Sequence, residues 1–253
     1  NVATIIAMLT VGFSDHINPA SHPLIANVGL AFPIFLLINI AFLVFWLCVK
    51  KRWALIPIGG LIIGFLPIRI YSPLNLRADA PEGCIKVIQY NVFGFNEWKD
   101  TNDQSEIINY ILREKPDILC MEESPVGTKK DLVDSALISI LQYSDTIDNG
   151  SISIYSKYPI VGHERINYHS DNKNSSGAFF VLTAPKDTTI VIANHFEITG
   201  LSLEQRAQFK AILKGKVEKD YMEIESKAIW RRLAESAKVR APQADAVAEY
   251  IQQ

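Results

Sequence analysis

Hydrophobic residues are distributed very unevenly along this 253-residue chain. Residues 1–71 are largely apolar, whereas the remainder alternates between short apolar runs and polar segments. Residues 24–49 contain no charged residue, and at about 1.5 Å per residue a helix of that length exceeds a bilayer core of roughly 30 Å. No polar face interrupts this run, which disfavours a buried helix of a globular protein. The pattern predicts a transmembrane helix over residues 24–49.

The sequence on either side of this helix predicts the rest of a membrane anchor. Residues 1–13 are apolar and uncharged but too short to cross, as expected for the tail of a crossing that began upstream. A basic cluster at residues 50–52 is followed by a second apolar stretch over residues 53–71, which begins with Trp. Basic clusters beside transmembrane segments stay in the cytoplasm, and Trp marks the interface. We therefore expect an anchor in the lipid bilayer over residues 1–71, with everything after it on the extracytoplasmic side.

Beyond residue 71 the pattern changes to that of a soluble α/β protein. Residues 72–84 contain two prolines and a glycine and are typical of a linker. Short apolar runs bounded by turn residues predict strands, and longer stretches with one apolar face predict helices. The expected strands are residues 85–90, 116–123, 151–155, 178–182 and 189–193, the last two joined as a hairpin by a turn at residues 185–187. The expected helices are residues 105–113, residues 132–141 and most of the chain from residue 203.

Charge and cysteine content narrow the class of protein. The chain has 25 Lys and Arg against 27 Asp and Glu, and residues 72–253 alone carry 21 against 26. This acidic balance gives no broad basic surface of the kind that duplex DNA requires, so nucleic acid is a possible but disfavoured partner. Cys48, Cys84 and Cys120 are too widely spaced for a metal-binding pattern. Cys84 and Cys120 could pair in an oxidising compartment, although two buried free thiols fit the sequence better.

Three of the predicted strands end on side chains that suit phosphoester chemistry. Asn91 follows the first, Glu122 and Glu123 follow the second, and Asn194 and His195 follow the last. A carboxylate can hold Mg²⁺, an amide can orient the substrate, and an imidazole can donate to developing charge on phosphorus. If the strands are neighbours, the first Asn, the second Glu and the His converge. Taken singly, each has a simpler explanation: a turn-forming Asn, glutamates that open a solvated loop, and a structural His.

In order and context, these segments resemble the endonuclease/exonuclease/phosphatase superfamily. The resemblance is carried by residues 85–92 (IKVIQYNV), 115–124 (KPDILCMEES), 150–160 (GSISIYSKYPI) and 194–197 (NHFE). The second segment departs from the family pattern, because Glu122 stands where Gln is usual, while Glu123 matches the metal-binding Glu. The third resembles a strand ending in Ser-Lys/Arg-x-Pro, and the fourth resembles the Asn/His motif whose His contacts the scissile phosphate.

The resemblance implies both a fold and a site. The implied fold is an α/β, deoxyribonuclease-like two-sheet sandwich over residues 85–253, behind the α-helical transmembrane region. The implied catalytic residues are His195, Asn91 and Glu123, with Glu123 as ligand to Mg²⁺ or Mn²⁺. Asn194 and Lys157 are implied to contact the substrate, although a lysine at this kind of position is often simply a surface residue. Bacterial members of the family with N-terminal membrane helices imply an inner-membrane protein whose soluble domain is periplasmic.

Two motifs of the family, Gly-Asp-x-Asn and a later Asp-His pair, are absent from this sequence. The chain also begins inside an apolar segment and ends inside a helical pattern. We therefore expect a fragment that is truncated at both ends, has an incomplete sandwich and is inactive by itself. An incomplete sandwich should leave one or both sheets with an unpaired apolar edge, which favours aggregation.

The sequence thus predicts a membrane-anchored, metal-dependent phosphoesterase that hydrolyses a phosphodiester. Its substrate is expected to be nuclease-like or a lipid or small-molecule phosphodiester. Two alternatives stay open: a non-catalytic, membrane-tethered binding domain with a degenerate site, and a phosphomonoesterase. No protein partner is predicted.

Overall fold

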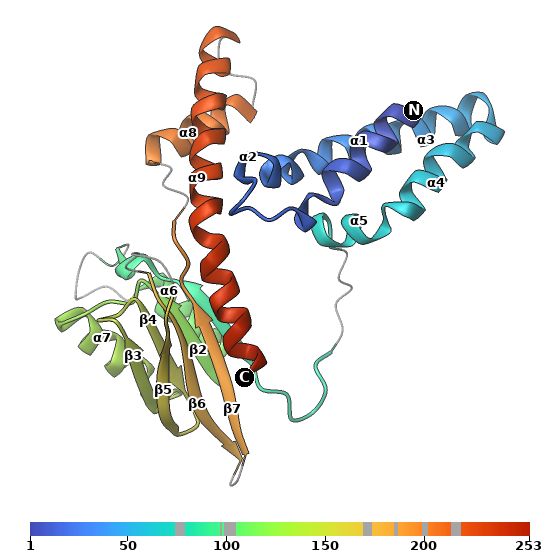
Figure 1. Cartoon of the computed structure of the whole chain (residues 1–253). Helices are drawn as coiled ribbons and strands as arrows, with labels where there is room; N and C mark the ends of the chain where they lie inside the picture. Colours follow the sequence, from blue (N-terminus) through green and yellow to red (C-terminus); the bar gives the residue numbers. More distant parts are fainter. Residues whose placement is uncertain are drawn as a thin grey trace. The chain divides into compact units, whose positions relative to one another are not determined.

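The structure is a computed structural model that describes residues 1–73, 79–96, 98, 105–168, 174–184, 187–198, 202–213 and 219–253. The chain divides into two compact units. The first unit comprises Asn1–Ala78 and Ile198–Ala241, and the second comprises Asp79–Glu197 and Pro242–Gln253. Figure 1 shows helices alone in the first unit and helices with two sheets in the second. The predicted mixed α/β class with two sheets is therefore confirmed.

The N-terminal helices follow the apolar pattern of the sequence. They are α1 (Val2–Gly12), α2 (Pro23–Ala26), α3 (Phe32–Val49), α4 (Leu55–Ile63) and α5 (Phe65–Tyr71), with single 3₁₀ turns at Ser14–His16, Asn27–Ala31 and Lys51–Ala54. Together α2, α3 and the turn between them form one apolar stretch, Pro23–Val49, with a mean hydropathy of 2.6. Only 17% of its most apolar window is buried within the structure, unlike the core helix of a soluble protein. It is long and apolar enough to cross a membrane, as an anchor or as a signal sequence.

The second predicted crossing is bent. Residues Lys51–Ile63 and Phe65–Tyr71 meet at an angle of 63° and make one further span only if they act as a pair. Close packing between the helices depends on small and polar residues. A Cβ built on Gly60 would lie 2.8 Å from the Ile5 side chain. The buried Asn39 donates to the backbone oxygen of Thr4 at 3.2 Å, which joins α3 to α1.

The first sheet of the second unit has the strand order β1-β2-β4-β3. Its strands are β1 (Val87–Asn91), β2 (Ile118–Glu122), β3 (Tyr143–Ile147) and β4 (Ile152–Ser156). Strands β1 and β2 are parallel, and β4 runs antiparallel to both β2 and β3. Parallel pairing needs a crossover, and α6 (Glu106–Glu114) supplies it, capped by the Ser105 hydroxyl. A second helix, α7 (Thr128–Leu137), follows β2.

The alternation of side chains along β2 explains how the layers pack. Leu119 and Met121 join a buried cluster with residues of α6 and α7, including Ile108 and Leu137. The intervening side chains of β2, Ile118 and Cys120, join a different cluster with residues of the second sheet. Because successive side chains of a strand point to opposite faces, β2 contributes to both cores. The first sheet therefore lies between the helices and the second sheet.

The second sheet is antiparallel, with the strand order β5-β6-β7. Its strands are β5 (Ile160–Ile166), β6 (Ser176–Ala184) and β7 (Asp187–Asn194). Phe179, Val181 and Ala193 bring β6 and β7 into the cluster shared with the first sheet. The last residues of the long helix α9 (Lys219–Gln252) also belong to this unit. Tyr250 Oη donates to Glu164 Oε2 at 2.7 Å, which joins the end of α9 to β5.

Most predicted strands are confirmed, but two were missed and one helix was misplaced. Strands β3 and β5 were not predicted, because consecutive polar residues interrupt each of them, at residues 144–146 and 163–165. Helix α7 begins at Thr128, four residues before its expected start. Helix α8 (Leu203–Leu213) and α9 confirm the helical character expected after residue 203. Most of the predicted turn at residues 185–187, and residues 74–78 of the predicted linker, lie outside the described residues.

Other expectations have mixed outcomes. The assignment of residues 85–253 to one domain stays a prediction; residues 198–241 belong to the first compact unit. All three cysteines are free, and Cys84 is exposed, so the expectation of two buried thiols is wrong for Cys84 and right for Cys120. Within the described sheets, β1 and β7 are edge strands with exposed Val87 and Ile190, as expected for unpaired apolar edges.

Candidate functional site

The turn after β2 holds Glu123 in a fixed, unusual backbone conformation. Glu123 has a φ of +50°, which costs a residue other than glycine about 1 kcal/mol or more. Hydrogen bonds on both sides hold it there: Glu123 N donates to Ser151 O at 3.1 Å, and Gly94 N donates to Glu123 O at 2.7 Å. The next residue, Ser124, donates from its backbone to Gly150 O at 2.7 Å. The carboxylate therefore projects from a backbone that its neighbours define.

The two consecutive glutamates have different roles. Glu122, the last residue of β2, is buried and accepts a hydrogen bond from the Gln89 side chain on β1. Glu123 retains a side chain that is 33% exposed. The prediction that both glutamates could simply open a solvated loop is wrong for Glu122. Cys120, two residues earlier on β2, is buried as well. Burial of the thiol, with the Glu122 charge as a smaller cause, raises the pKa of Cys120 to about 12.

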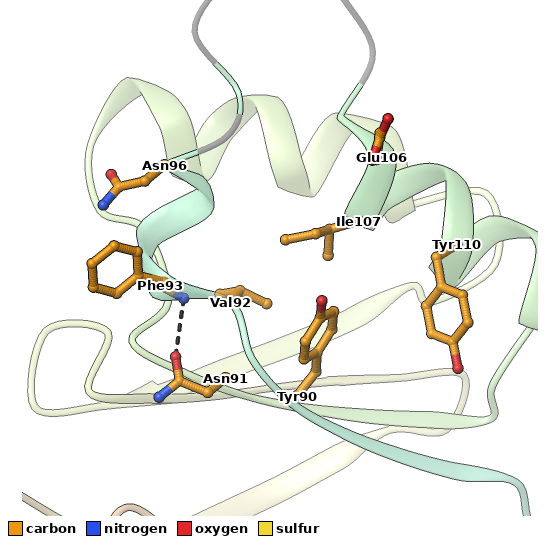
Figure 2. Close-up of a pocket in the computed structure, with 8 residues that line it drawn as sticks. All are labelled: Tyr90, Asn91, Val92, Phe93, Asn96, Glu106, Ile107 and Tyr110. Carbon is orange, nitrogen blue, oxygen red and sulfur yellow. Dashed lines mark hydrogen bonds between the residues drawn. The ribbon is translucent and has the colours of Figure 1, made fainter. Parts of the chain in front are cut away.

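Asn91 both forms a turn and contacts Glu123. Its Oδ1 accepts from Phe93 N at 3.0 Å, which starts the turn after β1 (Figure 2). Its Nδ2 donates to Glu123 Oε1 at 3.0 Å. The two contacts use opposite ends of one amide group, so Asn91 is a turn former, as the simple explanation predicted, and also contacts Glu123. The turn that follows is strained, with positive φ at Phe93, Gly94 and Phe95.

His195 reaches the same carboxylate from the second sheet. It follows β7, and its backbone N–H donates to Ser175 O at 2.9 Å. Its Nε2 lies 3.5 Å from Glu123 Oε1, and its side chain is only 14% exposed. The other ring nitrogen, Nδ1, is buried and has no hydrogen-bond partner among the described residues. Asn91, Glu123 and His195 thus meet at one point, although they come from three strands and two sheets.

The segment after His195 is secured by the end of α9. Gln243 is fully buried, and its Oε1 accepts from Glu197 N at 2.9 Å. Sequence reasoning did not single out this glutamine. A polar residue between Pro242 and Ala244, in an otherwise amphipathic helix, gives only a weak signal.

The two predicted substrate-contacting residues differ in position. Asn194 adjoins His195 at the end of β7, and its Oδ1 is buried without a partner among the described residues. Lys157 lies at the opposite end of the sheet, where its Nζ is 3.4 Å from Asp117 Oδ1 and its backbone N–H donates to Asp117 O. Since β2 is five residues long, about 17 Å of strand separates this end from Glu123. The structure does not bring Lys157 to the other predicted site residues.

A pocket of about 530 Å³ opens beside Asn91. It is lined by residues from β1, the turn after it and the start of α6: Tyr90, Asn91, Val92, Phe93, Asn96, Glu106, Ile107 and Tyr110 (Figure 2). The rings of Tyr90 and Tyr110 meet edge to face at a centroid distance of 6.5 Å. Among the described lining residues, Glu106 alone is charged. Trp98 packs half-buried against the core under α6 and α7.

The donor set at the site is small. Among the described residues, no group of three or more His, Cys, Asp and Glu side chains could hold a metal ion. The site offers the Glu123 carboxylate, with an amide and an imidazole beside it. Mg²⁺ is commonly held by one or two carboxylates, with water and substrate phosphate oxygens completing its octahedron. The residues present are thus compatible with a Mg²⁺ ion that substrate helps to bind.

Comparisons with known proteins cover the two parts of the chain differently. Residues 1–71 match the model of a family described as a domain of unknown function, DUF8431. This match ends at the last residue of α5 and covers the N-terminal helices alone. No curated protein matches the chain. Among solved structures, the crystal structure of SmcL is similar with a TM-score of 0.34 and 14% identity, over 60% of this chain and 70% of that one. So low a score carries no argument about the function.

Proposed function

We propose that this chain belongs to a membrane-anchored, metal-dependent phosphoesterase that hydrolyses a phosphodiester. The observation that carries the proposal is the meeting of Asn91, Glu123 and His195. The Glu123 Oε1 atom lies 3.0 Å from an amide nitrogen and 3.5 Å from an imidazole nitrogen, each supplied by a different strand end. These three residue types are the ones on which the resemblance to the endonuclease/exonuclease/phosphatase superfamily rests. A deoxyribonuclease-like arrangement of the two sheets is part of the same proposal.

Each of the three residues has a role that follows from its chemistry. Glu123 is the ligand for Mg²⁺, or for Mn²⁺, since a hard cation prefers carboxylate oxygen. Such an ion, when bound, would polarise a phosphoryl oxygen. Asn91 orients the Glu123 carboxylate through its amide N–H. His195 donates a hydrogen bond from Nε2 to the charge that develops on the phosphoryl group. Asn194 supports His195 from the adjacent position.

The pocket beside Asn91 suits the part of the substrate that is not phosphate. Its aromatic and aliphatic lining favours a ring or hydrocarbon group, and Glu106 disfavours a second anion. The net acidic charge of residues 72–253 points the same way, because it opposes the binding of long polyanions. A small or lipid-linked phosphodiester is therefore favoured over duplex nucleic acid.

Membrane attachment through residues 1–71 completes the proposal. The apolar stretch Pro23–Val49 and its largely unburied surface support an anchor. The basic cluster after it supports an extracytoplasmic position for the second unit, in the periplasm of a two-membrane bacterium. Fusion of a periplasm-active reporter after Ser72 tests this orientation, and activity restricted to the cytoplasm would overturn it.

The enzymatic proposal is tested with the full-length gene product and a Glu123→Ala variant. Hydrolysis of bis(p-nitrophenyl) phosphate is measured with and without Mg²⁺. We expect metal-dependent turnover that falls by about 10³-fold or more in the variant, because the metal ligand is lost. Glu82→Gln is the matched control, since Glu82 is an exposed carboxylate that precedes β1, whose other end carries Asn91. Undiminished metal-dependent turnover by Glu123→Ala would remove Glu123 from the site.

The two alternative functions give different results in the same assay. A phosphomonoesterase would prefer p-nitrophenyl phosphate to the bis ester. A non-catalytic binding domain would hydrolyse neither substrate at any metal concentration.

A further inference from the structure

Basic residues are concentrated in one part of α9. Residues 226–241 contain five Lys and Arg and one Glu. The rest of the chain from residue 72 onward therefore has 16 basic and 25 acidic residues, since the totals for residues 72–253 are 21 and 26. A strongly acidic sequence thus contains one short, strongly basic helical segment. Such separation of charge indicates a surface that meets an anion.

Three of the five basic side chains share one face of the helix. We define the basic face of α9 as Lys227, Arg231 and Lys238, with Arg232 at its border; all four are exposed. Spacings of four and seven residues place positions 227, 231 and 238 on one side of the helix. The opposite side carries Ile229 and Ser236, which are 3% and 8% exposed. The helix is therefore buried on this side, and Lys227, Arg231 and Lys238 lie on the other.

This face lies beside the start of the apolar span. A pocket of about 450 Å³ is lined by Leu24 together with Ser226, Lys227, Trp230 and Arg231. Leu24 is the second residue of the span Pro23–Val49, and all of these residues belong to the first unit. If a bilayer contained this span, the Trp230 indole and the Lys227 and Arg231 cations would lie at its surface. Trp and basic residues are the side chains typical of that interface.

From this juxtaposition we propose that the basic face of α9 binds anionic phospholipid headgroups at the membrane surface. The inference rests on the membrane anchorage in the proposed function. Lys and Arg side chains near a bilayer are attracted by anionic lipids, and the attraction is screened by salt within a Debye length of about 10 Å at 0.1 M. Nucleic acid offers the same phosphate chemistry, but the adjacent apolar span favours lipid.

The test uses the whole chain carrying a nitroxide at position 228. Ala228 is exposed and borders the basic face, so Ala228→Cys introduces the label there. Cys48→Ser and Cys84→Ser remove the exposed thiols, and Cys120 is buried. The protein is inserted into vesicles of phosphatidylcholine alone or mixed with phosphatidylglycerol. Mobility of the label, and its collisions with oxygen and with a water-soluble nickel chelate, report its distance from the headgroups.

We expect the label to be slowed and shielded from the nickel chelate in the anionic vesicles only, and to be released by high salt. Arg231→Gln/Arg232→Gln should abolish the difference between the two vesicle types. Arg113→Gln/Lys115→Gln is the matched control, because it removes the same charge from α6 and its C-cap and should change nothing. Lys238→Gln alone should reduce the difference between the two vesicle types without abolishing it. This single variant replaces the double variant as the test if the double variant misfolds.

Three results would overturn the inference. Identical spectra in both vesicle types would mean that the face does not sense lipid charge. Immobilisation by a DNA duplex added to protein in neutral vesicles, but not by anionic lipid, would assign the face to nucleic acid. Failure of the chain to float with neutral vesicles would remove the anchor on which the inference rests. None of these measurements uses phosphodiester hydrolysis, so a failed enzymatic proposal is recognised separately.

Discussion

The two ends of the β2–β4 strand pair can be compared within one sheet. At one end, Glu123 meets Asn91 from β1 and His195 from the second sheet. At the other end, Asp117 meets Lys157 in a single ion pair of 3.4 Å, and the Lys157 side chain is 57% exposed. Both ends carry charged residues next to buried strands. Among the described residues, Glu123 is contacted by side chains from two further elements, including a His195 that is largely shielded from water. Asp117 instead accepts from Lys157 and from the backbone N–H of Lys86 at 2.9 Å.

The comparison shows that a polar residue at a strand end is a poor indicator of a site by itself. Antiparallel pairing of β2 with β4 puts the end of β4 beside the start of β2. Lys157 therefore lies away from Glu123 even though both follow predicted strands. Parallel pairing of β1 with β2 has the opposite effect and brings Asn91 beside Glu123.

Replacing His195 should have the largest effect on this comparison. His195→Ala removes the contribution of the second sheet, and we expect turnover of the bis ester to fall by about 10²–10³-fold, as for the loss of one donor to a transition state. His163→Ala is a suitable control, because His163 pairs with Asp145 at 2.7 Å on β5, outside the site. Equal effects of the two substitutions on turnover would contradict a specific role for His195.

Weakening the contact between the sheets should have the next largest effect. Ile154 of β4 is fully buried in the cluster that joins both sheets. Ile154→Ala should lower the free energy of unfolding by about 2–5 kcal/mol, through lost burial and a residual cavity. Val161→Ala, at a position on β5 that is 61% exposed, should change it by less than about 0.5 kcal/mol. Denaturant titrations of both variants measure the difference, and similar losses would argue against the shared core.

A smaller, pH-dependent effect is expected at the turn that links the sheets. Burial raises the pKa of Asp148, but hydrogen bonds from Ser175 and Arg165 outweigh it and hold the pKa below its ordinary value. A carboxyl with a depressed folded pKa stabilises the fold above its unfolded pKa and loses that contribution as pH falls through the folded pKa.

The measurement for Asp148 is the free energy of unfolding of the wild type and of Asp148→Asn from about pH 6 to pH 2. Asn tolerates the φ of +50° at this position. The wild type should be the more stable protein near pH 6, and the two curves should converge toward the acid end. A constant difference across the range would exclude linkage through this carboxyl.

Lys157→Ala should have the smallest effect. Its ion pair is largely exposed, so the substitution should change the free energy of unfolding by about 0–1 kcal/mol. Turnover should stay within about two-fold of wild type, because no site residue is near. A large loss of turnover with unchanged stability would return Lys157 to the site and would contradict the comparison.

Local pattern was sufficient for several elements. The charge-free run at residues 24–49 predicted the long apolar span Pro23–Val49, and the buried runs at residues 118–121 and 152–155 predicted two central strands. Burial on both faces leaves a largely apolar run that is visible in the sequence, unbroken at residues 118–121 and interrupted only by Ser153 at residues 152–155. The edge strands β3 and β5 were missed because a strand with one neighbour and one exposed face needs few apolar residues.

The sequence by itself determined the identity of the candidate residues and their position at strand ends. Only the tertiary structure decided which of them meet. The packing of the sheets through Ile118, Ile154 and Phe179 sets the distance between His195 and Glu123, and the direction of β4 moves Lys157 away. The physical reason is that strand formation depends on neighbouring residues, whereas pairing direction and sheet packing depend on surfaces assembled from distant parts of the chain.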